Sequence, residues 1–580
     1  MAQAPDVVAV SVKRYSESST RKSSGTVYTP KRFADFAAEQ MLSLVTVPND
    51  RPTRLLDPAC GDGSLLLAML ERLPVDKRAR LVVHGFDTDV VAVQTTIERI
   101  RDRFPDQQLQ IEQRDFLEYL AGRDVDLFSA SSTREQFDLV IANPPYVRTQ
   151  VLGAAEAARL ATRFGLTGRV DLYYPFVLGI GEVLAPHGVA GIIVSNRFMT
   201  TRSGQAIRSG LRSAMNIRHV WDLGDTRLFD AAVLPAFVLA TGKASPAPGL
   251  AGFSTIYGSD QAATASSPDP LTALEQPDGA VVRMPDGQAF AVKHGQLSVS
   301  LDRSAVWRLS GVTADRWLQR VADRTWGNFS RIGKIKVGVK TTADRVFIRS
   351  DWDQLPAAER PELLRPLTTR HCARRFRPLV DLTVRQILYP HESGANGRAA
   401  VDLRRYPKSA RYLEQHRAAL EAREYVISAG RQWYEIWVPH DPEAWAQPKL
   451  VFPDISEKPV FWLDESGSVV NGECYWMRCE HGADPEWLWL ALAVANSTFI
   501  ESFYDRRFNN KLYAGRRRFI TQYVEQFPLP DPASGHGMAL IEMAQQVYAA
   551  TPSAEADAFA QILDRMVWAA FGFSVEEVGR

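Results

Sequence analysis

The sequence predicts an α/β fold with a mostly parallel sheet in its first half, followed by a domain of different composition. From Arg54 onward, short runs that are apolar throughout alternate with amphipathic stretches. Strands that are apolar at every position are typical of a parallel sheet that helices cover on both faces. The chain has 580 residues, more than one hydrophobic core usually organises. We therefore expect two or three domains.

The predicted elements follow one another at regular intervals. The strands are RLLDPA (54–59), LVVHGFD (81–87), FDLVIAN (137–143) and HGVAGIIVS (187–195), and clear helical stretches are SLLLAMLERL (64–73) and DLYYPFVLGIGEVLA (171–185). Two further runs, IRHVWDLG (217–224) and PAFVLATG (235–242), are joined by a connection too short for a helical crossover. We expect these two runs to form an antiparallel pair at one edge of the sheet.

The composition excludes several classes of protein. The formal net charge is only +1, so any basic surface must be local. Four cysteines are too few for a disulfide framework and their spacing fits no zinc template, which favours a reducing, cytoplasmic location without a metal. We find no apolar run near the length of about 18 residues that a membrane helix needs, and no signal-peptide core at the start. Residues 1–27 read as a mobile tail.

The second half of the chain divides by composition. Residues 246–315 are rich in Pro, Ser, Ala and Gly, which predicts a linker or loop-rich extension after a first domain over 28–245. Residues 316–535 mix helical and strand patterns and hold most of the tryptophans, so we expect a separate α+β domain there. Residues 536–580 read as a C-terminal helical extension.

The stretch LLDPACGDGSLLLAML (55–70) places Gly61 and Gly63 at a bend between a strand and a helix. Glycines permit a tight turn and close approach of a ligand, and the helix N-terminus offers free N–H groups. The pattern is neither a dinucleotide fingerprint nor a P-loop. A glycine turn that serves packing alone is the alternative.

Acidic residues follow the next two strands. Asp87 ends the second strand, where an acid in a Rossmann-like fold accepts hydrogen bonds from ribose hydroxyls. The alternative is that Asp87 or Asp89 caps a helix. Asp115 and Phe116, in EQRDFLEYL (112–120), follow a further putative strand between LVVHGFD and FDLVIAN, the third of the sheet, and they either begin a helix or hold the edge and face of an adenine. Both interpretations stay open.

The stretch NPPY (143–146) ends the fourth strand abruptly. Proline has no N–H for a sheet and restricts the residue before it, so pairing must stop at Asn143. The plain interpretation is a rigid turn with a core tyrosine. However, DPACGDG, Asp87, Asp115-Phe116 and NPPY all follow successive strands, at the edge where open α/β sheets bind ligands.

This ordered set resembles the S-adenosylmethionine-dependent methyltransferases. NPPY, with YTP (28–30) ahead of the glycine turn, resembles the N6-adenine DNA methyltransferases of restriction-modification systems. The Taq-type enzymes of the γ arrangement, which end in a target-recognition domain, are the most similar. The resemblance implies a class I methyltransferase fold with a mostly parallel seven-stranded sheet, S-adenosylmethionine as cofactor and double-stranded DNA as partner.

The resemblance also implies roles for individual residues. The Asn143 side-chain oxygen and the Pro144 carbonyl would accept the two N6 hydrogens of an adenine, and Pro145 would help to fix the direction of that carbonyl. The Tyr146 ring would stack on a base taken out of the duplex.

Phe229 would close the base pocket from the opposite side, with a core phenylalanine as the alternative. The implied cofactor contacts are Tyr28, Thr29, Asp57, Pro58, Ala59, Cys60, Gly61, Asp87, Asp115 and Phe116.

Three locally basic stretches interleaved with aromatics lie in the second domain, over 331–347, 363–378 and 506–522. Such stretches fit contacts to a DNA backbone, although solvated faces are the alternative. The candidate residues are Lys340, Arg370, Arg374, Arg375, Arg507, Lys511, Arg516, Arg517 and Arg518.

Three other functions compete with DNA methylation. An RNA or protein-glutamine methyltransferase also uses NPPY but usually lacks such a second domain. A DNA-binding specificity subunit with an inactive methyltransferase half is disfavoured by the intact Asp57, Asp87, Asn143 and Tyr146. A nuclease core at PDISEKPVF (453–461) is disfavoured because Glu457 and Lys458 are adjacent. We expect a monomer that protects host DNA and whose cognate endonuclease is encoded nearby but not bound.

Overall fold

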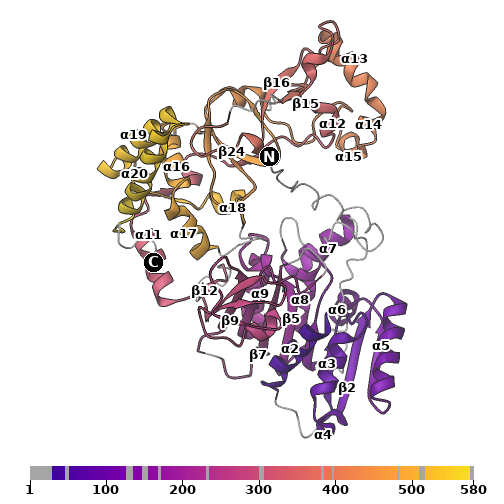
Figure 1. The fold of residues 1–580 in the computed structure, drawn as a ribbon. Coiled ribbons are helices and arrows are strands. Elements are labelled where there is room, and N and C mark those ends of the chain that lie inside the picture. The colour runs from indigo at the N-terminus through magenta and orange to yellow at the C-terminus, as the bar shows by residue number, and fades with distance from the viewer. Residues whose placement is uncertain are drawn as a thin grey trace, which may run out of the picture. The chain divides into compact units, whose positions relative to one another are not determined.

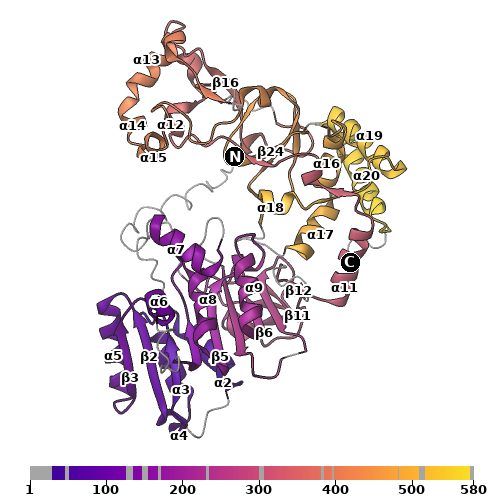
Figure 2. The ribbon, with the colours of Figure 1, turned by 180° about the vertical axis from the view of Figure 1, so that it is seen from behind.

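The computed structural model describes residues 29–45, 51–125, 135–146, 154–166, 171–229, 234–247, 249–298, 306–379, 385–394, 398–480, 482–508 and 516–574. The chain divides into two compact units, Met1–Gly311 and Val312–Arg580. The first unit runs from indigo to magenta in Figure 1 and the second from red to yellow; Figure 2 gives the opposite view. Among the described residues, every helix is too short or too polar to cross a membrane.

The described strands of the first unit join one 12-stranded sheet, in the order β3-β2-β1-β4-β5-β7-β6-β8-β11-β10-β9 with β12 beside β11. Strands β3, β2, β1, β4 and β5 are mutually parallel, and β7 runs antiparallel to both β5 and β6. The α/β fold and the antiparallel pair expected from the sequence are thereby confirmed, but the pair lies inside the sheet instead of at its edge, because β8 is added beside β6. The first seven strands are β1 (Thr53–Asp57), β2 (Leu81–Asp87), β3 (Gln108–Gln113), β4 (Phe137–Ala142), β5 (Leu184–Ser195), β6 (Met215–Asp222) and β7 (Pro235–Gly242).

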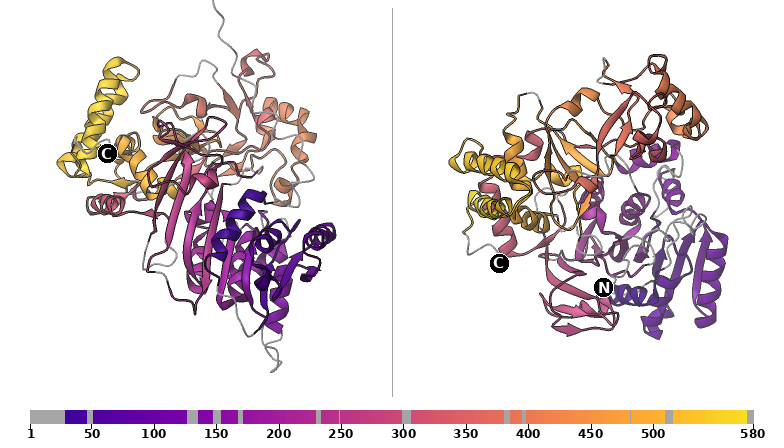
Figure 3. Two further views of the ribbon diagram at one scale, coloured as in Figure 1. Left: turned by 60° about the horizontal axis from the view of Figure 1, so that its bottom comes forward. Right: turned by 45° about the horizontal axis from the view of Figure 1, so that its top comes forward.

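Helices cover both faces of this sheet, because its strands are apolar on both sides. In β4, Phe137, Val140 and Ala142 face one core while Leu139 and Ile141 face the other. Helices α6 (Phe116–Val125), α8 (Tyr173–Val183) and α9 (Gln205–Ala214) supply the first core. Helices α2 (Lys31–Leu42), α3 (Ser64–Arg72) and α5 (Val90–Arg103) supply the second, and Figure 3 gives two further views of these layers. The other described helices of the unit are α4 (Val75–Arg78), α7 (Ala154–Phe164), η3 (Asn196–Met199) and α10 (Pro270–Ala273).

Residues 246–315 differ from the linker that the composition suggests. They form β8 (Gly252–Gly258), β9 (Ala265–Ser266), β10 (Val281–Arg283), β11 (Ala289–Leu297) and β12 (Leu309–Ser310), which extend the seven expected strands. Strand β8 pairs with β6 in parallel, and its Phe253 and Ile256 are buried. The Pro-, Ser- and Gly-rich stretches lie between these short strands, so average composition obscured them. The first unit therefore continues to Gly311 instead of residue 245.

The second unit is mixed α and β. Its described strands form β14-β24-β20-β22 and β15-β17-β16-β23 sheets and three two-stranded pairs. Helices α19 (Gly535–Ala550) and α20 (Ala554–Ala570) share a core with α16 (Trp487–Ala495) and α17 (Thr498–Arg507), with Leu540, Val547 and Trp568 buried. They are thus integral to this unit, whereas the sequence suggested an appended extension.

The bounds of the other elements of the second unit follow. The helices are α11 (Val312–Asp323), η4 (Phe329–Arg331), α12 (Asp344–Phe347), η5 (Trp352–Gln354), η6 (Arg370–Cys372), η7 (Leu403–Arg405), α13 (Pro407–Gln415), α14 (Arg417–Glu421), α15 (Glu424–Ser428), η8 (Pro442–Ala446), α16 (Trp487–Ala495), α17 (Thr498–Arg507) and α18 (Thr521–Val524). The strands are β13 (Gly327–Asn328), β14 (Lys336–Val337), β15 (Ile348–Arg349), β16 (Leu364–Thr368), β17 (Gln386–Leu388), β18 (His391–Glu392), β19 (Ala399–Ala400), β20 (Lys449–Pro453), β21 (Ile455–Ser456), β22 (Trp462–Asp464), β23 (Val469–Val470), β24 (Cys474–Met477), β25 (Arg517–Arg518) and β26 (Pro528–Leu529).

Candidate active site

The glycine turn after β1 is held against the end of β2. Gly61 and Gly63 have φ of 54° and 76°, a left-handed conformation that favours glycine. The Gly61 N–H donates to Asp87 Oδ2 at 2.9 Å, and the Thr96 hydroxyl donates to the Gly61 carbonyl at 2.8 Å. The turn is therefore fixed by side chains of β2 and α5, and it presents the start of α3 at the carboxyl edge of the sheet.

Asp87 links this turn to the next one. Its second carboxylate oxygen, Oδ1, accepts the Asp89 N–H at 2.9 Å. Asp89, not Asp87, caps α5 by accepting the Val91 N–H. The helix-cap alternative thus applies to Asp89, and the Asp87 carboxylate stands between two backbone turns at the end of β2.

Asp57, the last residue of β1, is fully buried. Its Oδ1 accepts the Ala59 N–H at 3.1 Å, whereas its buried Oδ2 makes no hydrogen bond to a described residue. Burial raises the Asp57 pKa to about 8. A buried carboxyl with an unused oxygen is the arrangement that a cationic ligand would complete. Pro58 and Cys60 are buried beside it, and Ala59 is half-buried.

Asp115 and Phe116 begin α6. The Asp115 Oδ1 accepts the Leu117 N–H at 2.7 Å, which caps the helix. The Phe116 ring is only 1% exposed and packs near Phe86 and Phe176. The structure thus gives Asp115 a helix-capping contact and places the Phe116 ring inside the core.

Asn143 lies directly after β4, where the prolines end the strand. Its side-chain Nδ2 donates to the Thr29 hydroxyl at 3.0 Å, across 114 positions of sequence. Thr29 is 8% exposed and lies two residues before α2. The start of α2 is therefore in contact with the NPPY turn, as the resemblance implies for the segment that begins with YTP. Tyr28 lies outside the described residues.

Tyr146 is supported from behind by a second tyrosine. The Tyr146 and Tyr173 ring centroids are 5.9 Å apart, and Tyr173 packs edge-on against Tyr174 at 4.7 Å. Burial raises the pKa of the Tyr146 hydroxyl, and this hydroxyl makes no hydrogen bond to a described residue. The ring is thus held by packing. Sequence reasoning assigned no role to Tyr173, although the repeated tyrosine in DLYYPF was a usable signal.

Phe229 is buried, with 7% of its surface exposed. Its ring packs edge-on against Phe33 of α2 at 5.5 Å. The structure therefore places Phe229 between the segment after β6 and α2, which is the core position that the sequence left as an alternative.

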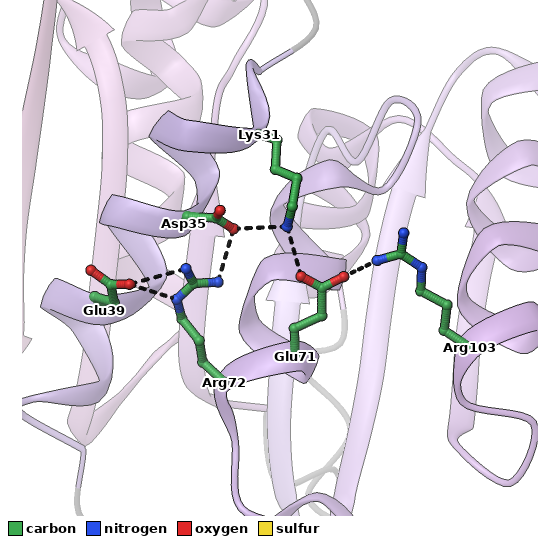
Figure 4. Close-up of polar contacts among 6 residues, drawn as sticks. All are labelled: Lys31, Asp35, Glu39, Glu71, Arg72 and Arg103. Carbon is green, nitrogen blue, oxygen red and sulfur yellow. Dashed lines mark hydrogen bonds and ion pairs between the residues drawn. The ribbon is translucent and has the colours of Figure 1, made fainter. Parts of the chain in front are cut away.

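Ion pairs tie helix α2 to α3, and α3 in turn to α5, as shown in Figure 4. Arg72 contacts Asp35 at 2.8 Å and Glu39 at 3.0 Å, and Lys31 contacts Asp35 and Glu71. Arg103 of α5 pairs with Glu71 from the other side. Exposed pairs contribute about 0–1 kcal/mol each. Their position matters more, because they fix the helix whose start contacts Asn143.

The basic candidates of the second unit occupy different surroundings. Lys340, Arg375 and Arg516 are exposed. Arg370 is also exposed but lies 3.2 Å from Glu473, and Arg374 donates to the Arg377 and Pro378 carbonyls. Arg507 is half-buried at the end of α17, and Lys511 lies outside the described residues.

Arg517 and Arg518 form β25 and use their charges inside the unit. The Arg517 side chain is 8% exposed and pairs with Asp505 at 2.7 Å and Glu501 at 2.9 Å. Arg518 pairs with Asp454 at 3.2 Å. Asp454 belongs to the stretch that suggested a nuclease, and it is here an ion-pair partner. Within this triplet Arg516 is exposed, Arg517 is buried, and Arg518 is partly exposed but paired.

Comparisons with known proteins agree with this geometry. The Eco57I restriction-modification methylase family matches residues 67–229, and the TaqI-like C-terminal specificity domain matches residues 400–529. The type II methyltransferase M.BanIII of Aneurinibacillus aneurinilyticus is 35% identical over 92% of this chain and 94% of its own. M.PaeR7I of Pseudomonas aeruginosa is 25% identical over 87% of this chain and 86% of its own.

Among solved structures, the type IIL restriction-modification enzyme MmeI in complex with DNA aligns with a TM-score of 0.54 and 13% identity. The alignment covers 94% of this chain and 72% of MmeI, and it supports the fold.

The fold and the site define a class I methyltransferase whose methyl donor is S-adenosylmethionine. The turn at Gly61, the buried Asp57 and the Asp87 carboxylate fit such a cationic, ribose-bearing cofactor. The chain belongs to the family of type II methyltransferases of restriction-modification systems, with a TaqI-like specificity domain in its second half. This confirms the family resemblance seen in the sequence.

Proposed function

We propose that this enzyme methylates N6 of an adenine that it takes out of duplex DNA, and so protects host DNA within a restriction-modification system. The observation that carries the proposal is the position of Asn143 at the end of β4, with its amide nitrogen donating to Thr29. With the nitrogen so engaged, the side-chain oxygen is the end of the carboxamide that serves as an acceptor for an N6 hydrogen.

The chemical need is to make a poor nucleophile reactive. The N6 lone pair of adenine is delocalised into the ring, and two hydrogen-bond acceptors draw the nitrogen toward tetrahedral geometry. Asn143 Oδ1 and the Pro144 carbonyl would be those acceptors, and they would bind the amine more strongly as positive charge develops on it. The proline pair keeps the carbonyl in one direction.

When bound, S-adenosylmethionine supplies an activated methyl group on a sulfonium. The chain's contribution is alignment: Thr29, a predicted cofactor contact, would orient Asn143, and Asn143 would hold the amine in line with the methyl carbon, so that the new N–C bond forms as the S–C bond breaks. The proton lost by N6 passes to solvent. Asp57, Gly61 and Asp87 would hold the cofactor, with Asp115 Oδ2 facing its adenine; Tyr28 remains a predicted contact.

The Tyr146 ring would stack on the extruded base, a contact worth roughly 1–3 kcal/mol in single-stranded recognition. Tyr173 would keep the ring in place. Phe229 would reach the base only by leaving its contact with Phe33.

The second unit would bind duplex DNA through exposed basic side chains such as Lys340, Arg370, Arg375 and Arg516. The TaqI-like specificity domain supports DNA over RNA or a protein glutamine as the substrate. We further propose that the enzyme acts in the cytoplasm as a monomer and that the cognate endonuclease does not bind it.

A test measures methyl transfer by Asn143→Ala with a matched control. The single-turnover rate should fall by about a hundredfold or more, as when one transition-state hydrogen bond is removed, while binding of DNA and cofactor changes little. Asn216→Ala is the control, because Asn216 lies at the start of β6, away from the carboxyl edge of the sheet, where it donates to the Gly242 and Ser245 carbonyls and accepts from Lys243 Nζ.

The product and the base contact are measured on the same proteins. Nucleoside mass spectrometry should find N6-methyladenine, and single-molecule sequencing gives its sequence context. Tyr146→Phe should keep most activity and Tyr146→Ala should not, because the ring face is the working part. Another methylated base, or full activity in Asn143→Ala, would overturn the proposal.

A further inference from the structure

A buried hydrogen-bond network joins β6, β8 and the start of η3, which directly follows β5, at the carboxyl edge of the sheet. Asp222 ends β6, and its Oδ1 accepts the Asn196 Nδ2 at 2.9 Å and the Gly224 N–H at 3.3 Å. Its Oδ2 accepts the Tyr257 hydroxyl at 2.7 Å. Asp222, Asn196 and Tyr257 are 2%, 7% and 7% exposed. Tyr257 comes from β8, outside the seven strands expected of a methyltransferase.

The same strand end holds the segment that follows β6. Gly224 has φ of 48°, and a Cβ there would lie 2.3 Å from the Ile256 carbonyl oxygen. The Asp225 Oδ1 accepts the Gly258 N–H at 2.8 Å. Residues 224 and 225 are therefore docked on the last residues of β8.

The two ends of the connection between β6 and β7 are also fixed. Leu223 N donates to the Pro235 carbonyl at 3.0 Å, and Asn196 N donates to the Leu234 carbonyl at 2.9 Å. Asn196 thus bonds through its backbone to one end of the connection and through its side chain to Asp222 at the other. The segment leads to Phe229, which packs on α2.

We propose that Asp222, Asn196 and Tyr257 position the segment Leu223–Phe229 for methyl transfer, so that β8 contributes a positioning residue to the active-site edge. The inference rests on the proposed function, since it concerns the wall of the proposed base pocket. A buried carboxylate is costly unless hydrogen-bonded, and here each bond fastens a different strand or the segment itself. An apolar residue at position 222 would also pack in the sheet, but it would leave the segment Leu223–Phe229 without these hydrogen bonds.

The network predicts a dependence on pH. Burial raises the pKa of Asp222 to about 6, and the nearby charge of Asp225 raises it further. The hydrogen bonds that Asp222 accepts from Asn196 and Tyr257 lower this pKa and so oppose the effect of burial. The ionised carboxylate accepts at both oxygens, so protonation weakens the network. The methylation rate should fall as the pH drops through about 6.

Tyr257→Phe and Asp222→Asn test the proposal, with Ser254→Ala as the matched control. Ser254 is also a buried residue of β8, but it bonds to His219 and His294 instead of the network. At saturating cofactor and DNA, the single-turnover rate should fall roughly ten- to a hundredfold in both test variants, as expected for a misplaced active-site group. Cofactor affinity and the rate of Ser254→Ala should match the wild type.

The pH profile separates positioning from mere stability. Loss of the Tyr257 hydrogen bond raises the Asp222 pKa, so the acid limb of the rate should move to higher pH in Tyr257→Phe and disappear in Asp222→Asn. A folded Tyr257→Phe with wild-type rate and profile would overturn the proposal. The proposal would also be overturned if the rate fell in Tyr257→Phe, Asp222→Asn and Ser254→Ala alike, in proportion to the fall in their melting temperatures. Failure of the wild type to methylate adenine would instead overturn the proposed function.

Discussion

Asp57 is a carboxyl group buried at the end of β1, and its protonation connects the cofactor site with pH. Its pKa is about 8 in the folded chain against an ordinary value of 3.8, because burial disfavours the charged form. The folded, cofactor-free chain therefore holds one more proton than the unfolded chain between these values. This contribution to stability is complete below about pH 3.8 and is lost as the pH rises toward about 8.

Cofactor binding should favour the ionised form of Asp57, whereas the cofactor-free chain favours the protonated form. S-adenosylmethionine carries ammonium and sulfonium charges, and either one favours the Asp57 carboxylate. Binding should therefore release a proton, and affinity should rise from about pH 6 to about 7.5, by at most about tenfold per pH unit. Calorimetry in buffers of different ionisation enthalpy measures the released proton. Asp57→Asn should bind more weakly and without this dependence; a flat wild-type profile would exclude Asp57 from the site.

The elements at the carboxyl edge are joined by close backbone contacts as well as by side chains. After β5, the chain makes the turn η3 and enters α9 at Gly204. A Cβ on Gly204 would lie 2.1 Å from the Phe198 carbonyl oxygen, which is backbone and cannot yield. Arg208 of α9 donates to this same carbonyl and to that of Thr201. The turn that leads away from Asn196 is therefore tightly packed.

The same substitution at two glycines should have opposite effects on stability. Gly204→Ala should lower the free energy of unfolding by about 1–3 kcal/mol, the usual cost of overpacking. Gly122→Ala should raise it by about 0.5–1 kcal/mol, because Gly122 lies within α6 and nothing is within 4 Å of its Cβ position. Denaturant unfolding followed by circular dichroism measures both. Equal changes in the free energy of unfolding for Gly204→Ala and Gly122→Ala would contradict the tight backbone contact described between Gly204 and η3.

The chain as a whole is nearly neutral, at +1, so contact with DNA depends on local basic groups. The structure separates arginines that are adjacent in sequence. Arg516 is exposed, whereas Arg517 is buried between Asp505 and Glu501. The specificity domain therefore uses some of its arginines for its own fold and leaves others for a partner.

Substitutions at these two positions should give different phenotypes. Arg516→Glu should weaken DNA binding and reduce the slope of log affinity against log salt by about one, because one phosphate contact is lost. Arg517→Ala should instead destabilise the second unit by roughly 3–5 kcal/mol, since two carboxylates lose their buried partner. Binding titrations at several salt concentrations and thermal unfolding distinguish the two. A salt slope in Arg516→Glu equal to that of the wild type would mean that this side chain makes no contact with DNA.

Local patterns in the sequence were sufficient for the parallel strands, the glycine turn and the strand end at NPPY, because each depends on neighbouring residues: apolar runs, left-handed glycines and prolines without an N–H. Strands β8 to β12 escaped prediction because they are short or lie among turn residues. The contacts of Asn143 with Thr29, Phe229 with Phe33, and Asp222 with Tyr257 join positions far apart in the chain. Only folding decides such contacts, since a side chain's pKa, burial and hydrogen-bond partners depend on which distant strand or helix is packed against it.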